Sequence, residues 1–521
     1  MSRLILNFKA GAGTALPNGL TYTLTQLATE GTFDTSTGEA KATGTVSKLE
    51  NLPTSTIGRQ ITGIAILWPQ AVSSMHLQLK LGDNTFGAAL TFPAGAAGEA
   101  LAPSTSYTFN VTVERTHITV GQADIDDWTS GGSKDITLQE ARTLTFDPNG
   151  GSGTIAGDKV FEGAAVLLPD GNGLTPPSGK TFVGWNTLPG GGGEFYAAGS
   201  TLTMPAGDFT LYALWSGDGS AEDNPILITD AQGMKDIGAS DDSRKKHYRL
   251  CNDLVLDDWE AIYYDYGGGQ DGDFWGTFDG GGHTVTLNGV KPIRAQFTNA
   301  SGYFMSLFAE IQGEVRRLRV DGQITVDGTD ENAAYYAGGI CGYNNYGGTV
   351  TDCISDVKVT ATGKMDILYA GSIAGYNLGS IFNCYATGKI ESTATAQYVS
   401  LGGIAGAKGG IARIANCAAL NSNISGKDGQ MNTYINRITE STGGIIVNSY
   451  ASATSAAFTD KGLDKPNGAD CDAKPAASWW KESGRWADSY TIGSSTVTLT
   501  PWDFGTTWEV TDGNLPVLLR K

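Results

Sequence analysis

The second half of the chain repeats one pattern of small, apolar and polar residues. Four copies open with two small residues and an apolar one; the second small residues are Ser306, Gly339, Ser372 and Gly403, so the pattern recurs every 31 to 33 residues. Within each copy, apolar and polar residues alternate with period two between glycine-rich turns, which is typical of short strands. A single copy cannot bury its apolar face, whereas stacked copies can, so the pattern predicts a parallel β-helix.

Other positions keep the same interval. Cys353, Cys384 and Cys417 lie one repeat apart and Ser449 follows them, while a weaker fifth copy begins at Gly443. Equivalent residues of stacked coils lie above one another at the inter-strand spacing of about 4.8 Å. Since a free cysteine packs as a small hydrophobic residue, we interpret this series as an internal ladder rather than as a metal or redox stack.

Both ends of the β-helix carry residues suited to closing it. A short amphipathic helix is expected from Asp230 to Ile237, before the repeats. After them, Trp502 and Trp508 are expected to cap the last coil, because an open sheet edge invites association with other chains. With these additions the β-helical region extends over residues 217–521.

Two further segments precede the β-helix. Between 143 and 215, strand-like runs flank a turn at 147–151, and Phe182, Trp185, Tyr212 and Trp215 supply a small aromatic core. Runs within residues 1–140 alternate apolar and polar residues as half-buried antiparallel strands do. The sequence therefore predicts an all-β protein with an N-terminal β-sandwich (1–140), a small β repeat module (141–216) and a C-terminal right-handed parallel β-helix (217–521).

Composition and charge narrow the classes of protein further. The 521 residues include 72 glycines, and 54 Asp and Glu against 35 Lys and Arg give a net charge of -19. The glycines lack the three-residue period of collagen, and the low charge content excludes a highly charged disordered chain. No basic patch is present to meet phosphates, which argues against a nucleic-acid partner. No apolar run approaches the about 18 residues of a membrane-spanning helix.

The sequence offers little catalytic chemistry. It contains no HExxH, GxSxG or P-loop motif, and its six cysteines form no CxxC pair. Asp352 and Asp356 stand in one repeat without counterparts in the next. Because a polysaccharide-cleaving site needs paired carboxylates across a groove, we expect no catalytic residues.

One acidic loop is a candidate calcium site. Asp265, Asp271 and Asp273, with Asp279 close by, lie in the glycine-rich segment DYGGGQDGDFWGTFD. Calcium takes six to eight oxygen ligands, which such a loop can supply. The alternative is a solvated loop whose aspartates bond to their own turns. Calcium is therefore the only cofactor that the sequence leaves open.

A candidate binding surface lies in the second and third repeats. Tyr343, Asn344, Asn345, Tyr346 and Tyr376 combine aromatic rings with amide groups. Such a set suits sugar stacking together with hydrogen bonding. The alternative is that Tyr343 and Tyr376, which follow equivalent glycines, cap the internal stack.

Three stretches resemble known bacterial modules. GTFDGGGHTVT, the repeated GGICG, GSIAG and GGIAG, and NCYATG resemble proteins that carry the GLUG motif. The series FDPNGG, FVGWNT and LYALW resembles the internalin B-type repeat, also called the Listeria–Bacteroides repeat. The stretch SYTFNVTVERTHITVGQADIDDWTSGG resembles the fimbrillin-like proteins of Bacteroidetes.

These resemblances imply a cell-adhesion or fimbria-associated protein on the bacterial surface or outer membrane. It would bind glycans, host proteins or other pilus subunits without turnover, and its export signal would lie upstream of Met1. Two alternatives stay open: a polysaccharide-active lyase or hydrolase built on the β-helix, and a purely structural pilus or spacer subunit. The last alternative predicts an open or exchangeable strand within residues 1–140.

Overall fold

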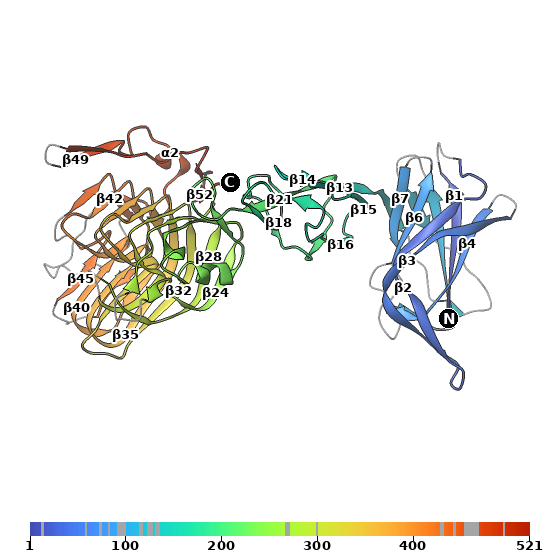
Figure 1. The fold of residues 1–521 in the computed structure, drawn as a ribbon, viewed down its shortest axis with the longest axis horizontal. Coiled ribbons are helices and arrows are strands. Elements are labelled where there is room, and N and C mark those ends of the chain that lie inside the picture. The colour runs from blue at the N-terminus through green and yellow to red at the C-terminus, as the bar shows by residue number, and fades with distance from the viewer. Residues whose placement is uncertain are drawn as a thin grey trace. The chain divides into compact units, whose positions relative to one another are not determined.

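The structure is a computed structural model, and it forms two compact units (Figure 1). One unit comprises Met1–Asp147, Thr154–Pro169 and Gly199–Leu211; the other comprises Pro148–Gly153, Asp170–Ala198 and Tyr212–Lys521. The small repeat module is thus shared between the units, and the predicted domain boundaries stay predictions. The residues that the structure describes are 1–11, 15–57, 60–71, 75–81, 84–90, 100–113, 118–121, 129–130, 136–265, 271–297, 301–427, 432–440, 444–452, 468–492 and 495–520.

The N-terminal strands form the predicted sandwich. They are β1 (Ser2–Ala10), β2 (Thr21–Asp34), β3 (Glu39–Ile57), β4 (Gln60–Leu67), β6 (Met75–Leu81), β7 (Asn84–Leu90), β9 (Thr105–Val113), β10 (Ile118–Gly121), β11 (Thr129–Ser130) and β12 (Ile136–Glu140). Most pairs are antiparallel, and alternate residues such as Leu4, Leu6, Tyr22 and Phe109 fill the core. The long strand β3 pairs first with β2 and then with β4, so it passes from one sheet to the other.

Strand β1 lies inside this arrangement rather than at an edge. It pairs antiparallel with β4 along 2–8 and parallel with β9 along 3–10. Its backbone is therefore hydrogen-bonded on both sides. An exchange of β1 for another strand would have to break both ladders.

Short antiparallel pairs build the small repeat module. They include β14 (Ser152–Gly153) with β17 (Leu174–Thr175), β16 (Ala165–Leu167) with β20 (Thr201–Thr203), and β18 (Thr181–Asn186) with β21 (Phe209–Ser216). The predicted aromatic core forms: Trp185 is fully buried, and the Phe182 ring packs edge-on against Trp185 and Trp215 at centroid distances of 5.2 and 5.6 Å. The Trp215 indole N–H donates to the carbonyl of Pro148, which fixes the turn.

The repeats stack into a parallel β-solenoid with three columns of strands (Figure 1). The first column is β22 (Ile226–Ile228), β23 (His247–Leu250), β27 (Thr277–Asp279), β31 (Glu314–Arg316), β34 (Thr349–Thr351), β37 (Ser380–Phe382), β42 (Arg413–Ala415) and β46 (Ile445–Val447). The second is β24 (Leu254–Glu260), β28 (Thr284–Lys291), β32 (Arg319–Gly328), the start of β35 (Ile354–Gly371), β38 (Tyr385–Ala386), β39 (Ile390–Ser392), β43 (Ala418–Ala419), β44 (Ile424–Ser425), β47 (Tyr450–Ser452) and β48 (Ala469–Cys471). The third is β30 (Ser301–Ile311), β33 (Ala334–Asn344), the end of β35, β36 (Ala374–Asn377), β40 (Thr395–Gly402), β41 (Ala405–Lys408) and β45 (Thr433–Asn436), and β29 (Ile293–Gln296) pairs antiparallel with β30.

The repeat register read from the sequence is confirmed for the second, third and fourth copies. In the first copy it is off by one residue at Ser306, which pairs with Gly338 and not with Gly339, because a register shift lies between Ser306 and Phe308. Ile340 N–H donates to the Ile373 carbonyl at 3.0 Å, and Ile373 N–H donates to the Ile404 carbonyl at 2.9 Å. Ile404 N–H then donates to Ile438, not to a residue near Gly443. The fifth copy is therefore corrected: its apolar start is Ile438, and Gly443 itself lies outside the described residues. The sequence hid it because Arg437 replaces the small residue.

Side chains inside the rod repeat as expected. Cys353, Cys384 and Cys417 are fully buried, and their thiols donate to backbone carbonyls of their own or the preceding coil. Ser449 continues the series by accepting the Cys417 N–H. Burial raises the pKa of the Cys384 thiol well above its ordinary value, so these thiols are packing groups of the predicted ladder.

The residue before each ladder position adopts a left-handed backbone. Asp352, Asn383, Asn416 and Asn448 have φ between 40° and 55°. Asp and Asn tolerate this region better than most residues because their short polar side chains bond locally. One such residue per coil turns the chain sharply from the first column into the second.

The C-terminal segment runs back along the side of the solenoid. It contains α2 (Ala477–Trp480), β49 (Ser489–Ile492), β50 (Ser495–Thr498), β51 (Trp508–Glu509) and β52 (Val517–Leu518). We call residues 477–520 the strap. The left-handed residues bind it one coil at a time. Asn448 donates to Arg485, Asn416 to Ala487 and Asn383 to Thr500, while Asp352 accepts the Trp508 indole N–H.

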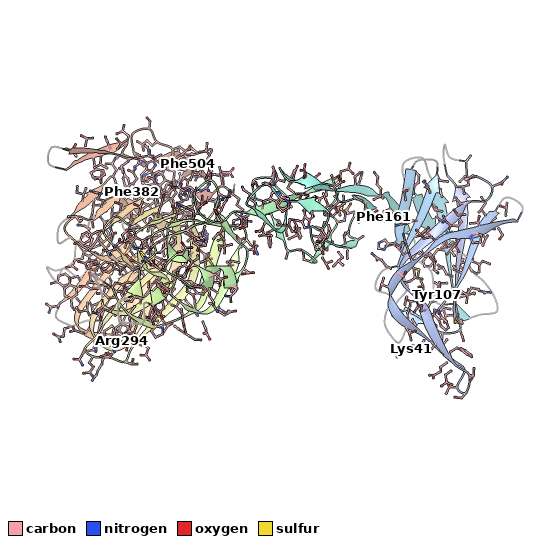
Figure 2. The ribbon with its side chains drawn as sticks, viewed as in Figure 1. Lys41, Tyr107, Phe161, Arg294, Phe382 and Phe504 are labelled. Atoms are coloured by element: carbon pink, nitrogen blue, oxygen red, sulfur yellow. The ribbon has the colours of Figure 1, made fainter. Side chains whose placement is uncertain are left out.

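The prediction that Trp502 and Trp508 cap the last coil is therefore wrong. Both pack sideways on inner coils, in a cluster that includes Ile354, Tyr385 and Ala418. Phe504, which is labelled in Figure 2, lies in the same segment. Its ring stacks on that of Trp502. At the opposite end, the predicted helix forms as α1 (Ala231–Asp236), and its Met234 closes the hydrophobic core.

Candidate functional site

Stacked tyrosines cover part of the outer face of the third column. Phe304, Tyr336, Tyr369, Tyr398 and Tyr434 come from successive coils, and neighbouring ring centroids lie 4.9 to 5.8 Å apart. Phe304, Tyr336 and Tyr369 are register partners on successive strands, so the inter-strand distance sets their spacing. Tyr398 is not the register partner of Tyr369, because Tyr369 pairs with Ser400 and Tyr398 with Ile367. We call these five residues the aromatic row.

Two of the predicted binding residues form a second stack beside this row. The rings of Tyr343 and Tyr376 are nearly parallel, at 7° and 5.1 Å between centroids. Each also meets a ring of the aromatic row edge-on: Tyr343 meets Tyr336, and Tyr376 meets Tyr369. Their faces are therefore used for stacking within the protein.

Burial of the aromatic rings decreases along the row. Phe304 is fully buried and touches Phe297, which follows strand β29, whereas Tyr369, Tyr398 and Tyr434 are half-buried. Burial raises the pKa of Tyr336 to about 12, so the phenol stays protonated in the physiological range. The Tyr398 hydroxyl donates to the buried carboxylate of Glu440. The accessible end of the row thus presents ring edges and hydroxyl groups.

The predicted amide groups lie inside the coils. Asn344 is fully buried and its amide donates to Asn377 in the next coil at 2.8 Å. Asn345 is also buried, and its amide donates to the carboxyl group of Glu310. Tyr346 is the exposed member of the predicted set, with 46% of its surface accessible. That the set as a whole binds a ligand stays a prediction.

A buried polar chain connects the acidic loop to these residues. The Trp275 indole N–H donates to Asp273 Oδ1 at 2.9 Å, and the Asn345 side chain bonds to the same carboxylate. Asn345 also contacts Glu310, and its Oδ1 accepts the Tyr346 N–H at 2.7 Å. The structure thus brings together Asp273, Asn345 and Tyr346, which the sequence placed in two separate candidate sites.

Burial perturbs both carboxyl groups of this chain. It raises the pKa of Glu310 to about 9, with a further rise from the neighbouring Asp273 charge. The pKa of Asp273 is also raised by burial. Glu310 Oε2 is buried and has no hydrogen-bond partner in the described part of the chain. The pair therefore shares one polar pocket in which Glu310 stays protonated at neutral pH.

The other acidic residues are placed differently. Asp265 is exposed, and its backbone pairs with that of Asp271, whose side chain lies outside the described part of the structure. Asp279 is buried and accepts from Arg317 and from the Gly281 N–H. Burial alone would raise the pKa of Asp279, but these partners hold it below its ordinary value. Across the described ranges, no three His, Cys, Asp or Glu residues gather as metal ligands, and the calcium hypothesis stays a prediction.

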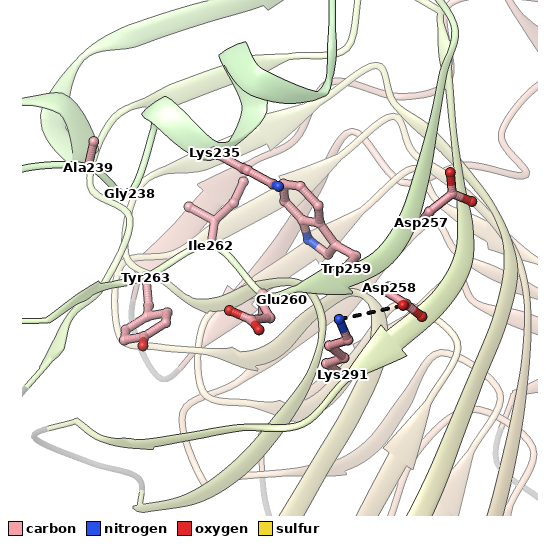
Figure 3. A pocket seen from close by; sticks show the side chains of 11 residues that line it. Lys235, Gly238, Ala239, Asp257, Asp258, Trp259, Glu260, Ile262, Tyr263 and Lys291 are labelled. Carbon is pink, nitrogen blue, oxygen red and sulfur yellow. Dashed lines mark ion pairs between the residues drawn. The ribbon is translucent and has the colours of Figure 1, made fainter.

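A separate pocket lies between the end of α1 and strand β24 (Figure 3). Its volume is about 430 Å³, which is within the usual range for small-molecule sites. Trp259 is almost completely buried and donates to the Leu307 carbonyl. Lys291 pairs with Asp258 at 3.5 Å, and Lys235 and Glu260 also line the pocket. The pocket offers charges of both signs around an aromatic wall.

Sequence reasoning missed Trp275, Glu310 and this pocket. Trp275 belongs to the quoted acidic segment, but its exposure of 52% is a property of the folded corner. Glu310 stands at a position equivalent to Tyr343 and Tyr376 in the following coils. A glutamate at a position where the next two coils have tyrosine was the feature of the sequence that could have identified Glu310. In the described part of the chain, no helix has the length and apolar character needed to cross a membrane.

Family models match three parts of the chain. The fimbrillin-like model matches residues 1–128, the Listeria-Bacteroides repeat domain matches 143–214, and the GLUG motif matches 368–391. The chain combines three known modules. All three resemblances read from the sequence are confirmed, and the GLUG match covers the third of the regular coils. No curated protein matches the chain.

Solved structures resemble parts of it. A candidate cell adhesion protein of Bacteroides ovatus is 30% identical, with 25% of this chain and 45% of that chain covered and a TM-score of 0.21. One from Bacteroides uniformis is 24% identical, with 24% and 50% covered and a TM-score of 0.19. A candidate immunoglobulin A1 protease of Bacteroides ovatus is 18% identical, with 58% and 94% covered and a TM-score of 0.37. The chain spans about half the length of the two cell adhesion proteins.

Proposed function

We propose that this protein is an extracellular, fimbria-associated adhesin that binds its ligands without converting them. The observation that carries the proposal is the fimbrillin-like match over residues 1–128 joined to a solenoid built from stacked repeats. Fold alone does not fix function, so the surface of the solenoid has to supply the binding chemistry. Rows of tyrosine hydroxyls and an exposed polar corner are features of that kind.

Glycans or surface proteins of a host are the proposed partners. A rigid solenoid presents the same groups on coil after coil, so weak contacts add by effective concentration. The net charge of -19 keeps the protein soluble and disfavours anionic surfaces. Binding to neutral or basic surfaces is the expected preference.

Binding of the full chain to immobilised glycans and matrix proteins, with analysis of the bound glycans for shortened products, tests this function. We expect retention on at least one surface and no change in glycan length. If the protein were retained on no surface, or if products appeared, the adhesin proposal would be refuted.

A polysaccharide-cleaving enzyme is the second candidate function. The Asp273–Glu310 pair favours it, because a carboxylic acid with a raised pKa is what a general acid requires. Glu310 is only 1% exposed, however, and a catalytic acid has to reach the glycosidic oxygen. Product formation that Glu310→Gln abolishes would establish the enzyme instead of the adhesin.

A spacer or pilus subunit is the third candidate. It predicts self-association through an exchangeable strand, but β1 is paired on both sides within the described residues. Sedimentation of the full chain over a range of concentrations measures self-association. Growth of polymers would favour this candidate.

A further inference from the structure

Two exposed aromatic rings on the solenoid differ from all members of the tyrosine stacks. Trp275 and Tyr346 have exposed fractions of 52% and 46%. Among the residues that the structure describes, neither ring stacks on another aromatic ring. Sugar recognition by stacking requires a free ring face, and Tyr343 and Tyr376 each use one face to stack on the other and also meet a further ring edge-on. Trp275 and Tyr346 therefore keep ring faces that a ligand can reach.

The two rings lie at the same corner of the solenoid, two coils apart. The coil between them passes through Gly313, whose carbonyl accepts the Thr349 N–H just beyond Tyr346. A Cβ atom added to Gly313 would lie 2.0 Å from the Gly276 carbonyl oxygen, next to Trp275. Glycine is thus needed where the backbones pass closely. Two inter-strand spacings separate the rings by about 10 Å along the axis, a length that a short oligosaccharide can span.

A built polar chain lies beneath the two rings. It runs from the Trp275 indole N–H through Asp273 and Asn345 to the Tyr346 backbone, with Glu310 bonded to Asn345. The Asp273 side chain is 14% exposed and so can accept a further hydrogen bond at the surface. Glu310 Oε2 is the buried acceptor without a hydrogen-bond partner in the described residues.

The chemistry of this corner selects among sugars. The Asp273 carboxylate accepts from hydroxyl and ammonium groups and repels carboxylates, and Arg244, 3.7 Å from its Oδ1, offsets part of its charge. The opposite faces of a hexose differ, and its C–H face packs on an aromatic ring. Sialylated and uronic-acid glycans are therefore disfavoured, and neutral or amino sugars are favoured.

We propose that Trp275 and Tyr346 form a saccharide-binding subsite for neutral or amino-bearing hexose oligosaccharides, with Asp273 as the hydrogen-bond acceptor. The inference rests on the proposed adhesin function and specifies its ligand class. It assigns recognition to one corner of the solenoid instead of the aromatic row.

Calorimetric titration of the full chain with cellotriose, chitotriose and the fully deacetylated chitosan trisaccharide tests the subsite, with 3′-sialyllactose as the anionic comparison. We expect at least one of the first three to bind, and Trp275→Ala and Tyr346→Ala each to weaken it about tenfold or more. Trp275→Phe should retain most of the affinity because it keeps a ring.

Ile411→Ala is the matched control. Ile411 is 59% exposed at the same corner, farther along the axis. Its replacement should change the dissociation constant less than twofold. Since Trp275 and Tyr346 are exposed, their variants should unfold at the temperature of the unmodified protein.

The outcomes separate this inference from the adhesin function. Absence of binding to all three trisaccharides, equal binding of sialyllactose, or affinity unchanged in both alanine variants would overturn the subsite. If retention on immobilised surfaces persists in that case, the adhesin function stands and only the subsite fails. If surface retention is absent too, both fail.

Discussion

The sandwich and the solenoid complete their hydrogen-bond ladders in opposite ways. In the sandwich, β1 pairs with β9, so that Arg3 lies beside Ser106, 103 residues away. In the solenoid, each strand pairs with its own equivalent one repeat later, so that Val350 lies beside Ile381. In the solenoid, the repeat length therefore predicts from the sequence which residues lie beside each other. It also limits what a surface offers, because identical rings in register stack on one another and leave few free faces.

The strap does not follow the repeat of the solenoid. Loss of its contacts should have the largest effect on stability. Trp508 is fully buried, lies 4.3 Å from the Trp502 ring and donates to Asp352. Trp508→Ala should lower the unfolding free energy of the solenoid unit by about 3–5 kcal/mol, because it leaves a large cavity and removes one of the hydrogen bonds that Asp352 accepts.

Urea unfolding followed by circular dichroism measures this loss, with the transition of the sandwich as an internal reference. Trp275→Ala, at an exposed tryptophan, should change stability by less than about 0.5 kcal/mol. Equal effects of the two substitutions would mean that the strap does not brace the coils.

The position of the strap could not be predicted from the sequence. In the repeats, the period predicts which strands pair with each other. Residues 477–520 have no such period, and their tryptophans indicate only that these side chains are buried. Placement on the side depends on Asn383, Asn416 and Asn448, whose side chains happen to point at passing carbonyl groups. Those asparagines look in the sequence like ordinary turn residues.

Glu310 breaks the aromatic pattern of its column and should make the solenoid sensitive to pH. Its pKa of about 9 in the folded protein exceeds the ordinary value of 4.5, so the folded state holds a proton that the unfolded state releases. Stability is then fully present below pH 4.5 and falls as the pH rises toward 9. Glu310→Gln removes the titrating group. From pH 6 to pH 8, the unfolding free energy of the unmodified protein should therefore fall by roughly 3 kcal/mol relative to that of the variant.

Thermal unfolding at several pH values measures this difference. The exposed Glu260→Gln provides the control for loss of a charge in the same unit. A gap between the Glu310→Gln and unmodified proteins that stays constant with pH would show that Glu310 is ionised in the folded state.

The candidate site was predicted only in part, because the repeat period fixes the register of some of its residues and not of others. The sequence correctly placed Tyr343 and Tyr376 one above the other, because the repeat fixes their register. It could not show that Asp273 and Asn345 share one polar chain, since the acidic segment precedes the regular copies and its path is not set by the period. Exposure of Trp275 likewise depends on the corner, not on the residues beside it in sequence.

A close contact on the sandwich tests the non-repetitive region. A Cβ atom on Gly87 would lie 1.8 Å from Cζ of Phe161, the residue labelled in Figure 2. The buried Phe161 ring stacks on His76 with 6.2 Å between ring centroids. Gly87→Ala should push the ring away and destabilise this unit by about 1–3 kcal/mol. Burial lowers the pKa of His76, so displacement of Phe161 should let that pKa rise toward its ordinary value, as measured by NMR titration. An unaltered His76 titration in the variant would show that Phe161 stays in place.

Substitution of a left-handed asparagine should have the smallest effect on unfolding free energy. It separates the contribution of the repeat's turn from that of the contact with the strap. Asn383 has φ of 49° and also donates to Thr500 of the strap. Asn383→Gly should cost about 1 kcal/mol, because glycine keeps the backbone but loses the bond. Asn383→Ala should cost about 1 kcal/mol more, because alanine adds the strain of the left-handed region. Equal losses of unfolding free energy for the two variants would mean that the bond to the strap, and not the left-handed turn, is what asparagine contributes at position 383. A loss for the alanine variant alone would mean that only the left-handed turn requires asparagine, and that the strap contributes nothing at this coil.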